Sequence, residues 1–185
     1  MLGLRADPVD ITPGGNLSLD GRAYKIFSAE AISWQDARYY VDVNLPGWHL
    51  ATVTSPVENA FIWAGIESAW AGQGNVVPQP VLQFWLGGYQ ASPQAWTWVT
   101  GEPWNYTEWS PGEPNGDLGW TGSLTVGRLG VASWNDEGGW QSGIHGFVVE
   151  SAVPEPGTYG VFASLALMGF AWVNRVSRRT AVERE

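Results

Sequence analysis

The stretch ISWQDARYYVDVNLPGWHLATVTSPVENAFI, residues 32–62, decides the fold because it contains the start signals of two helices. The first signal is Ser33, which opens the pattern S-x-x-D and resembles a capping box. Trp34, Ala37 and Val41 follow at spacings that place them on one helical face. The sequence therefore predicts a first helix that begins after Ser33 and packs through these three residues.

The second start signal lies in SPVENAFIWAGIESAW, residues 55–70. Ser55 is suited to the N-cap, Pro56 to the first helical position and Glu58 to the third. The i, i+3, i+4, i+7 period predicts that this helix packs through four apolar residues, Val57, Ala60, Phe61 and Ala64.

The rest of the domain has the pattern of short strands joined by turns. A stretch from 105 to 123 has no periodicity and is rich in Gly, Pro, Asn and Trp. Long loops of this kind are often functional, so a structured functional loop is expected there. Extended segments are predicted at GRAYKIFS (21–28), GWHLATV (47–53), FWLGGYQ (84–90), AWTWVTGEPW (95–104), SLTVGRLGVASW (123–134) and GFVVES (146–151).

The composition limits the class of partner. The chain has 185 residues, with 18 Asp and Glu against 9 Lys and Arg, and no basic patch interleaved with aromatic residues. No nucleic-acid partner is therefore expected, whereas an acidic surface suits divalent cations. Because there is no cysteine, thiol nucleophiles, thiolate metal sites and disulfides are excluded. Most of the 13 Trp residues are expected to fill the core or cover the sheet.

From residue 153 the composition changes. An uncharged, mostly apolar run from 159 to 173 predicts a single C-terminal apolar helix, short against the roughly 20 residues that a bilayer core requires. Arg175, Arg178 and Arg179 follow, which favours a cytoplasmic end and transient membrane insertion. The other interpretation is a buried core helix.

The C-terminal segment contains, in order, Pro154, Glu155 and Pro156, the apolar run and the arginine cluster. This order resembles the bacterial PEP-CTERM sorting signal. The resemblance implies a protein exported by a Gram-negative-type bacterium to the cell envelope, the cell surface or the extracellular matrix, with exosortase as a partner. The first 15 residues, MLGLRADPVDITPGG, lack a basic region followed by an apolar run, so no export signal is visible. We expect either that the true start lies upstream, which is the favoured interpretation, or that the chain is a fragment.

Five stretches, taken in order, resemble the successive signatures of the C-type lectin-like domain. The resemblance implies an α+β fold with two helices, small antiparallel sheets and a long ligand loop. It also implies an N-terminal extension (1–20), a lectin-like domain (21–152) and a sorting or anchor segment (153–185). The five stretches are residues 32–62, FWLGGYQ (84–90), WTWVTGEPWNYTEWSPGEPNG (96–116), WNDEGGW (134–140) and FVVE (147–150).

In sugar-binding members of that family, the Glu and Asn of E-P-N and the Asn and Asp of W-N-D coordinate one calcium ion. The resemblance assigns these roles to Glu113, Asn115, Asn135 and Asp136, with Asp117 as a possible further ligand, and implies a cis Glu113–Pro114 bond. The residue types are suitable, because calcium takes about six to eight oxygen ligands from carboxylates, amide carbonyls and water.

The same motifs imply a carbohydrate with adjacent equatorial hydroxyls, as in mannose, glucose or fucose. Glu113, Asn115 and Asn135 would bind the hydroxyls, since carboxylates accept hydrogen bonds and amides both donate and accept. Trp120 and Trp140 are the candidates to stack on the sugar ring.

Two observations leave alternatives open. The family usually has another Glu where this chain has residues near Thr121, and neither Asp117 nor Glu137 stands at the matching place. In addition, E-P-N-G is a good turn sequence and W-N-D also suits turn capping. The sequence thus predicts calcium-dependent carbohydrate binding, with a calcium-independent fold for protein binding or a matrix-structural role as the alternative. No enzyme is expected, because no known catalytic motif is present.

Overall fold

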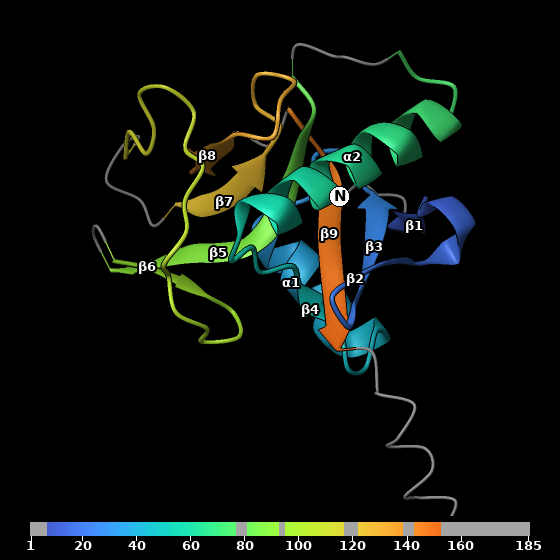
Figure 1. The fold of residues 1–185 in the computed structure, drawn as a ribbon, viewed down its shortest axis with the longest axis horizontal. Coiled ribbons are helices and arrows are strands. Elements are labelled where there is room, and N and C mark those ends of the chain that lie inside the picture. The colour runs from blue at the N-terminus through green and yellow to red at the C-terminus, as the bar shows by residue number, and fades with distance from the viewer. Residues whose placement is uncertain (1–6, 77–80, 93–94, 117–121, 139–142, 153–185) are drawn as a thin grey trace, which may run out of the picture. The chain divides into compact units, whose positions relative to one another are not determined.

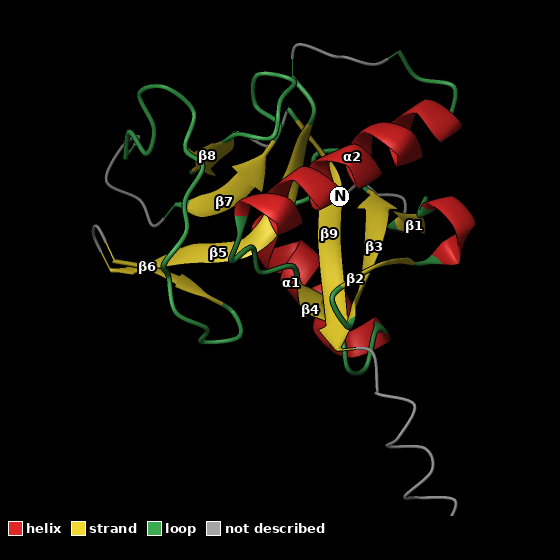
Figure 2. Cartoon of the chain, viewed as in Figure 1, coloured by secondary structure: helices red, strands yellow, loops and turns green. Residues whose placement is uncertain are grey.

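The computed structural model describes residues 7–76, 81–92, 95–116, 122–138 and 143–152. The chain divides into two compact units, 1–152 and 153–185, and every described residue belongs to the first unit. Figures 1 and 2 show this unit as a twisted sheet accompanied by two helices. The predicted C-terminal apolar helix and the sorting segment lie outside the described residues.

Within the described ranges the sheet has nine strands, and its main path runs β1-β3-β9-β5-β7-β8. β2 pairs with β3, β4 with β9 and β6 with β5. The β5–β9 pair is parallel and the other pairs are antiparallel. The strands are β1 (Val9–Asp10), β2 (Leu17–Leu19), β3 (Arg22–Ser28), β4 (His49–Leu50), β5 (Gln83–Ser92), β6 (Ala95–Trp98), β7 (Ser123–Val126), β8 (Trp134–Glu137) and β9 (Ile144–Ala152).

The beginning and the end of the unit lie side by side. β3 pairs with β9 over its whole length, from Arg22 opposite Ala152 to Ser28 opposite Gly146. Residues 9–19, within the segment predicted as an N-terminal extension, form β1 and β2 and pair with β3. A short 3-10 helix, η1 (Pro13–Gly15), joins those two strands. The sheet therefore begins before the GRAYKIFS strand.

Helix α1 (Trp34–Asn44) has the predicted N-cap and the predicted buried face. The backbone N–H of Asp36 donates to the Ser33 hydroxyl at 3.0 Å. Trp34, Ala37 and Val41 are all buried, and they pack with apolar side chains of β3, β5 and β9. The local signals around Ser33 are sufficient here because the helix has one apolar stripe on a polar background.

Helix α2 (Pro56–Gly72) starts at the predicted cap, but the predicted buried face is wrong. Val57 is 64% exposed, and the side chains that reach the core are Ile62, Trp63, Ile66, Ala69 and Trp70. The helix is apolar nearly all the way round, so periodicity alone does not select one stripe.

The polar residues Glu58 and Asn59 are buried on the α2 core face because partners satisfy them. The Tyr24 hydroxyl donates to Glu58 at 2.7 Å, and the Trp134 indole N–H donates to Asn59 at 2.8 Å. These long-range bonds fix the rotation of the helix on the sheet.

The two helices cover opposite faces of the sheet. Alternate residues of β3 separate the two cores: Ile26 belongs to the core under α2, and Phe27 belongs to the core under α1. The expectation for tryptophan is confirmed, because all ten Trp residues in the described ranges lie in these cores or pack against them: Trp34, Trp48, Trp63, Trp70, Trp85, Trp96, Trp98, Trp104, Trp109 and Trp134.

The β-rich half differs from the prediction in two places, and the first is that the strand predicted over 95–104 ends at Trp98. The predicted strand over 123–134 is two strands, β7 and β8, because the chain turns back between them. Gly127 and Gly130 take positive φ angles of 97° and 67° in that turn, a conformation that favours glycine. As a result W-N-D is the start of strand β8, which pairs with β7.

Candidate functional site

A cluster of aromatic rings anchors the loop that follows β6. The Trp104 ring lies 4.4 Å from that of Trp98 and 5.9 Å from that of Trp134, measured between ring centroids. Trp109 packs 4.9 Å from Trp96 and 5.8 Å from Trp134. Trp98 and Trp134 are fully buried, so the loop is attached to the core of the domain and not to its surface.

Backbone hydrogen bonds then align the loop with strand β8. The N–H of Trp134 donates to the carbonyl of Glu108 at 2.7 Å, and the N–H of Ser110 donates to the carbonyl of Trp134 at 2.8 Å. The loop therefore passes beside the first residue of β8, and its next residues continue toward Asn135 and Asp136.

The E-P-N triplet lies in a tight turn. The Glu113 N–H donates to the carbonyl of Ser110 at 3.0 Å, and the Glu113–Pro114 bond is cis, as predicted. The flanking Gly112 and Gly116 have positive φ angles of 89° and 65°. This turn presents the backbone N–H groups that follow the proline toward β8.

Asp136 joins the two motifs. Its carboxylate accepts hydrogen bonds from the backbone N–H groups of Asn115, at 3.1 Å, and Gly116, at 2.9 Å. Asp136 is only 6% exposed, so these bonds to its carboxyl oxygens are formed away from bulk water. The Glu113 carboxylate also accepts from the Asn115 N–H at 3.1 Å. The four sequence-predicted residues Glu113, Asn115, Asn135 and Asp136 are thus brought together.

Arg128, which the sequence reasoning missed, lies between the two motifs. Its Nη1 atom donates to Glu113 Oε1 in an ion pair and to Asn135 Oδ1 at 2.5 Å. The Glu113 side chain is 5% exposed and that of Arg128 is 40% exposed. One sequence signal points to this residue: Arg128 is the only Lys or Arg between residues 39 and 174. A single cation in a long acidic stretch is expected to have carboxylate partners.

A hydrogen-bond network that includes Gln83 and Glu137 holds the Asn135 side chain in place. Its amide donates to Glu137 Oε2 at 3.1 Å and to Gln83 Oε1 at 3.3 Å. Gln83 in turn accepts from the Thr125 hydroxyl at 2.8 Å and donates to Glu137 at 3.2 Å. With its side chain held from both sides, Asn135 directs its oxygen to Arg128.

The carboxylates at this site have altered proton affinity. Burial, followed by the neighbouring Asp136 carboxylate, raises the pKa of Glu113 against the opposing effect of Arg128. Burial likewise raises the pKa of Glu137, while hydrogen bonds from Gln83 and Asn135 oppose that rise. Several acidic groups thus share the charge of one guanidinium.

Other predicted site residues lie outside the described residues. These are Asp117, Trp120 and Trp140, together with the Thr121 position and the sorting-signal residues Pro154, Glu155, Pro156, Arg175, Arg178 and Arg179. Their predicted roles stay predictions.

Comparison with known proteins gives an identity for both parts of the chain. The family model described as the PEP-CTERM protein-sorting motif matches residues 152–178. A lectin of Pleurodeles waltl is 30% identical over 129 residues, which cover 69% of each chain. The chain belongs to the C-type lectin family. A mannose-binding isoform of a C-type lectin from Oxyuranus scutellatus is also 30% identical, over 65% of this lectin and 72% of the relative.

A solved structure agrees with the fold of the lectin domain. The cow C-type carbohydrate-recognition domain of CD23, crystallised in the presence of a GlcNAc2Man3 oligosaccharide, matches with a TM-score of 0.58 at 23% identity. The match covers 80% of this chain and all of that domain. At this identity the likeness concerns the fold alone.

C-type lectins typically bind calcium, an ion that takes about six to eight oxygen ligands. Two oxygens that would coordinate it, Glu113 Oε1 and Asn135 Oδ1, are in contact with Arg128 Nη1. The Asp136 carboxylate is occupied by two backbone N–H groups. Within the described ranges, no group of three or more His, Cys, Asp or Glu side chains could hold a metal. With Arg128 in this position, the four predicted ligands in the described ranges, Glu113, Asn115, Asn135 and Asp136, do not fit a calcium ion.

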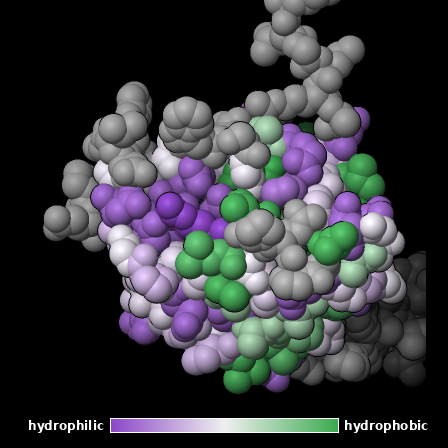
Figure 3. Space-filling model, turned by 90° about the horizontal axis from the view of Figure 1, so that it is seen from above, coloured by the Kyte–Doolittle hydropathy of each residue, from purple (hydrophilic) through white to green (hydrophobic). Residues whose placement is uncertain are grey.

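Some apolar side chains are exposed on the surface, and two of them lie in the turn that carries Arg128. Figure 3 shows hydrophobic groups separated by hydrophilic ones where the face is not covered by grey atoms. Exposed apolar side chains include Leu129 and Val131, in the β7–β8 turn beside Arg128, at 54% and 50% exposure. The turn that supplies Arg128 is therefore itself open to solvent.

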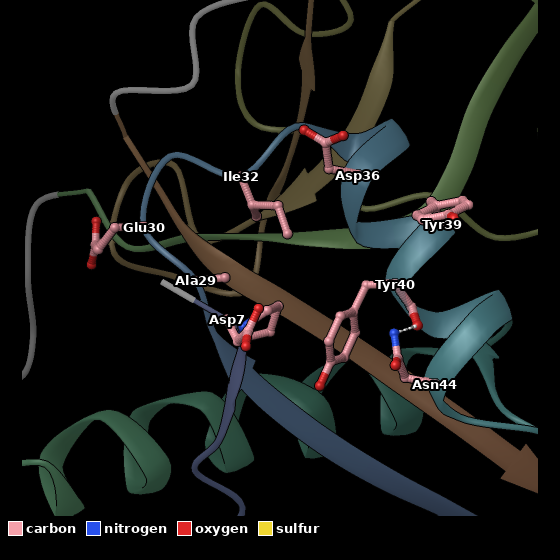
Figure 4. A pocket seen from close by; sticks show the side chains of 9 residues that line it. Asp7, Ala29, Glu30, Ile32, Asp36, Tyr39, Tyr40 and Asn44 are labelled. Atoms are coloured by element: carbon pink, nitrogen blue, oxygen red, sulfur yellow. Dashed lines mark hydrogen bonds between the residues drawn. The ribbon is translucent and has the colours of Figure 1, made fainter. Parts of the chain in front are cut away.

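A separate cavity of about 250 Å³ lies beside α1, and Figure 4 shows its lining. Tyr39 and Tyr40 of the helix and three carboxylates, Asp7, Glu30 and Asp36, contribute to the wall. None of the predicted site residues lines it, so this cavity is distinct from the E-P-N and W-N-D site.

The sorting motif indicates export and sorting to the cell envelope. Among the described residues, no helix is both long and apolar enough to cross a membrane. The apolar run of 159–173, in which the sequence predicts transient membrane insertion, is not among those residues.

Proposed function

We propose that the domain binds carbohydrate at the surface formed by residues 110–116 and strand β8. The observation that carries this proposal is the bond between Asp136 and the backbone of Asn115 and Gly116, which brings the E-P-N turn to W-N-D. Carboxylate acceptors and amide groups that both donate and accept then lie together, which is the chemistry that pairs with sugar hydroxyls.

The relatives support a saccharide as the ligand. One relative is named as a mannose-binding isoform, and the CD23 domain was crystallised with a mannose-containing oligosaccharide. E-P-N at residues 113–115 favours adjacent equatorial hydroxyls, so mannose, glucose and fucose are the expected sugars. Export by a Gram-negative-type bacterium, with exosortase acting on the tail, would bring the domain to the cell surface or the extracellular matrix.

The position of Arg128 supports a second candidate function. The sequence predicts calcium-dependent binding, whereas a guanidinium in contact with Glu113 and Asn135 favours a domain that needs no metal. A calcium-independent lectin-like fold for protein binding or a matrix-structural role is therefore the alternative. Saccharide binding is the better supported of the two, because the amides and carboxylates of both motifs are kept.

A glycan array separates these functions. The full chain is expected to bind mannose-, glucose- or fucose-terminated glycans and to bind galactose, whose 4-hydroxyl is axial, at least about tenfold more weakly. Asn115→Ala is expected to reduce binding about tenfold, because a hydrogen-bonding amide is lost. Asn105→Ala, which changes an exposed amide earlier in the same loop, is the matched control. A folded protein that binds no glycan on the array contradicts the proposal and favours the alternative.

A further inference from the structure

The guanidinium of Arg128 and a metal ion would compete for the same oxygens. Nη1 of Arg128 contacts one residue from each motif, Glu113 of E-P-N and Asn135 of W-N-D. A cation bound by these two residues would need the same Glu113 Oε1 and Asn135 Oδ1 atoms. Arg128 in this position and a bound ion are therefore mutually exclusive.

The third oxygen-bearing residue acts within the protein as well. The Asp136 carboxylate accepts from two backbone N–H groups and so stabilises the turn after Pro114. A metal ion in this place would normally neutralise Glu113 and Asp136 and hold the loop to β8. Here Arg128 on one side and Asp136 on the other hold the loop to β8.

The charge distribution along the chain agrees with this role. No other Lys or Arg occurs between residues 39 and 174, so Arg128 is the only basic residue of this half of the domain. It stands in the β7–β8 turn, and its partner Glu113 is 15 residues away in sequence. Because the Glu113 side chain is only 5% exposed, its negative charge requires a compensating cation close by.

We propose that Arg128 is the resident cation of this site, so that the lectin domain orders its ligand loop and binds saccharide without calcium. The part of the proposal that concerns the ligand rests on the proposed function; the part that concerns the cation does not. Arg128 acts as a positioning residue that fixes the oxygens of Glu113 and Asn135, and its side chain, 40% exposed, remains open to a bound sugar hydroxyl.

Thermal unfolding of the full chain, with calcium and with chelator, tests whether Arg128 takes the place of calcium at this site. At about 10 mM calcium, well above the roughly 10⁻³ M dissociation constant of weak extracellular sites, the wild-type midpoint is expected to stay unchanged. Arg128→Gln frees the oxygens of Glu113 and Asn135, so its midpoint is expected to rise by about 3 °C with calcium. Arg38→Gln, which removes an exposed base of α1, controls for net charge and is expected to behave like wild type.

Only that pattern supports the proposal. A wild-type midpoint that rises with calcium, or an Arg128→Gln midpoint that does not, contradicts it. If Arg128→Gln does not fold, equilibrium dialysis of the wild-type chain with radioactive calcium decides instead. No bound calcium at about 1 mM supports the proposal, and one ion per chain contradicts it.

The glycan array, repeated with calcium and with chelator, separates this proposal from the proposed function. Equal glycan binding by the wild-type protein with calcium and with chelator supports both carbohydrate binding and the role of Arg128. Binding that requires calcium overturns the role of Arg128 and leaves carbohydrate binding intact. No glycan binding, together with a midpoint indifferent to calcium in wild type and raised in Arg128→Gln, overturns the proposed function and leaves the role of Arg128 in place.

Discussion

Two arginines, Arg22 and Arg128, each hold carboxylates from distant parts of the sequence, but they connect different parts of the fold. Arg22 Nη1 lies 3.1 Å from Glu150 Oε1, and Nη2 lies 2.8 Å from Glu102 Oε1. Glu58 Oε1 is 3.8 Å from Nη1. These partners belong to β9, to the loop after β6 and to α2, so Arg22 connects elements of the main fold.

The Arg128 cluster orders one loop, whereas the Arg22 cluster contributes to the fold as a whole. Glu150 and Glu58 are 1% and 5% exposed, which makes them expensive to leave without a cation. Around Arg128 the backbone N–H groups of the E-P-N turn share the task of satisfying Asp136. We therefore expect loss of the Arg22 ion pairs to lower the stability of the whole fold. Loss of the Arg128 ion pair is expected to disorder the loop that carries E-P-N.

The largest effect is expected from Arg22→Met. Removal of this cation leaves the buried carboxylates of Glu58 and Glu150 without compensation, so the free energy of unfolding is expected to fall by about 3–5 kcal/mol. Urea denaturation measures the change. Arg38→Met, which breaks an exposed 3.9 Å pair with Asp42, should cost less than about 1 kcal/mol. Equal costs for the two variants would contradict the role of Arg22 in connecting elements of the main fold.

An intermediate effect is expected from Trp134→Phe. Trp134 connects α2 to the site, because its indole donates to Asn59 at 2.8 Å and its ring packs on Trp104 and Trp109. Loss of the donor leaves a buried amide oxygen unpaired, at a cost of about 2 kcal/mol in unfolding free energy. Trp48→Phe, at a half-buried position outside this aromatic cluster, is the control. A loss no greater than that of the control would show that the indole N–H does not connect the two parts.

A smaller effect is expected from Asp136→Asn. The Asn115 and Gly116 N–H groups donate to different oxygens of Asp136, and an amide has only one oxygen, so one of the two bonds is lost and the other loses its charge assistance. A cost of about 1 kcal/mol in unfolding free energy is expected. Hydrogen exchange of these two N–H groups should become faster while exchange in β3 and β9 is unchanged. Glu108→Gln, at an exposed carboxylate of the same loop, provides the comparison. Faster exchange throughout the sheet would mean that Asp136 supports the whole fold.

The smallest effect is expected in the pH dependence of stability. Burial raises the pKa of Glu150 above its ordinary value of 4.5, against the opposing effects of the Thr52 hydroxyl, His49 and Arg22. A raised folded-state pKa gives stability that is present below the unfolded value and lost as the pH rises through the folded value. Glu150→Gln lacks that loss, so its stability relative to wild type should increase between pH 4.5 and neutral pH. Urea midpoints across this interval measure the difference, and a relative stability that falls contradicts it.

The sequence was sufficient wherever the signals were local. Ser33 and Ser55 mark their helix starts because a hydroxyl at the N-cap satisfies an N–H three residues later, with no help from the rest of the chain. The cis Glu113–Pro114 bond, by contrast, was implied by the resemblance to the family and not by a local signal, and the structure has it. The order of the five motifs along the chain was sufficient to indicate the C-type lectin family.

Only the tertiary structure decided the rest. The buried face of α2 depends on Tyr24 and Trp134, which reach Glu58 and Asn59 from far along the chain, and an almost uniformly apolar helix carries no local record of those contacts. The place of Arg128 likewise depends on how the β7–β8 turn brings it to Glu113. Its isolation among acidic residues indicates that it has partners, but pairing across a folded loop determines which oxygens it binds, and so whether the site still needs a metal.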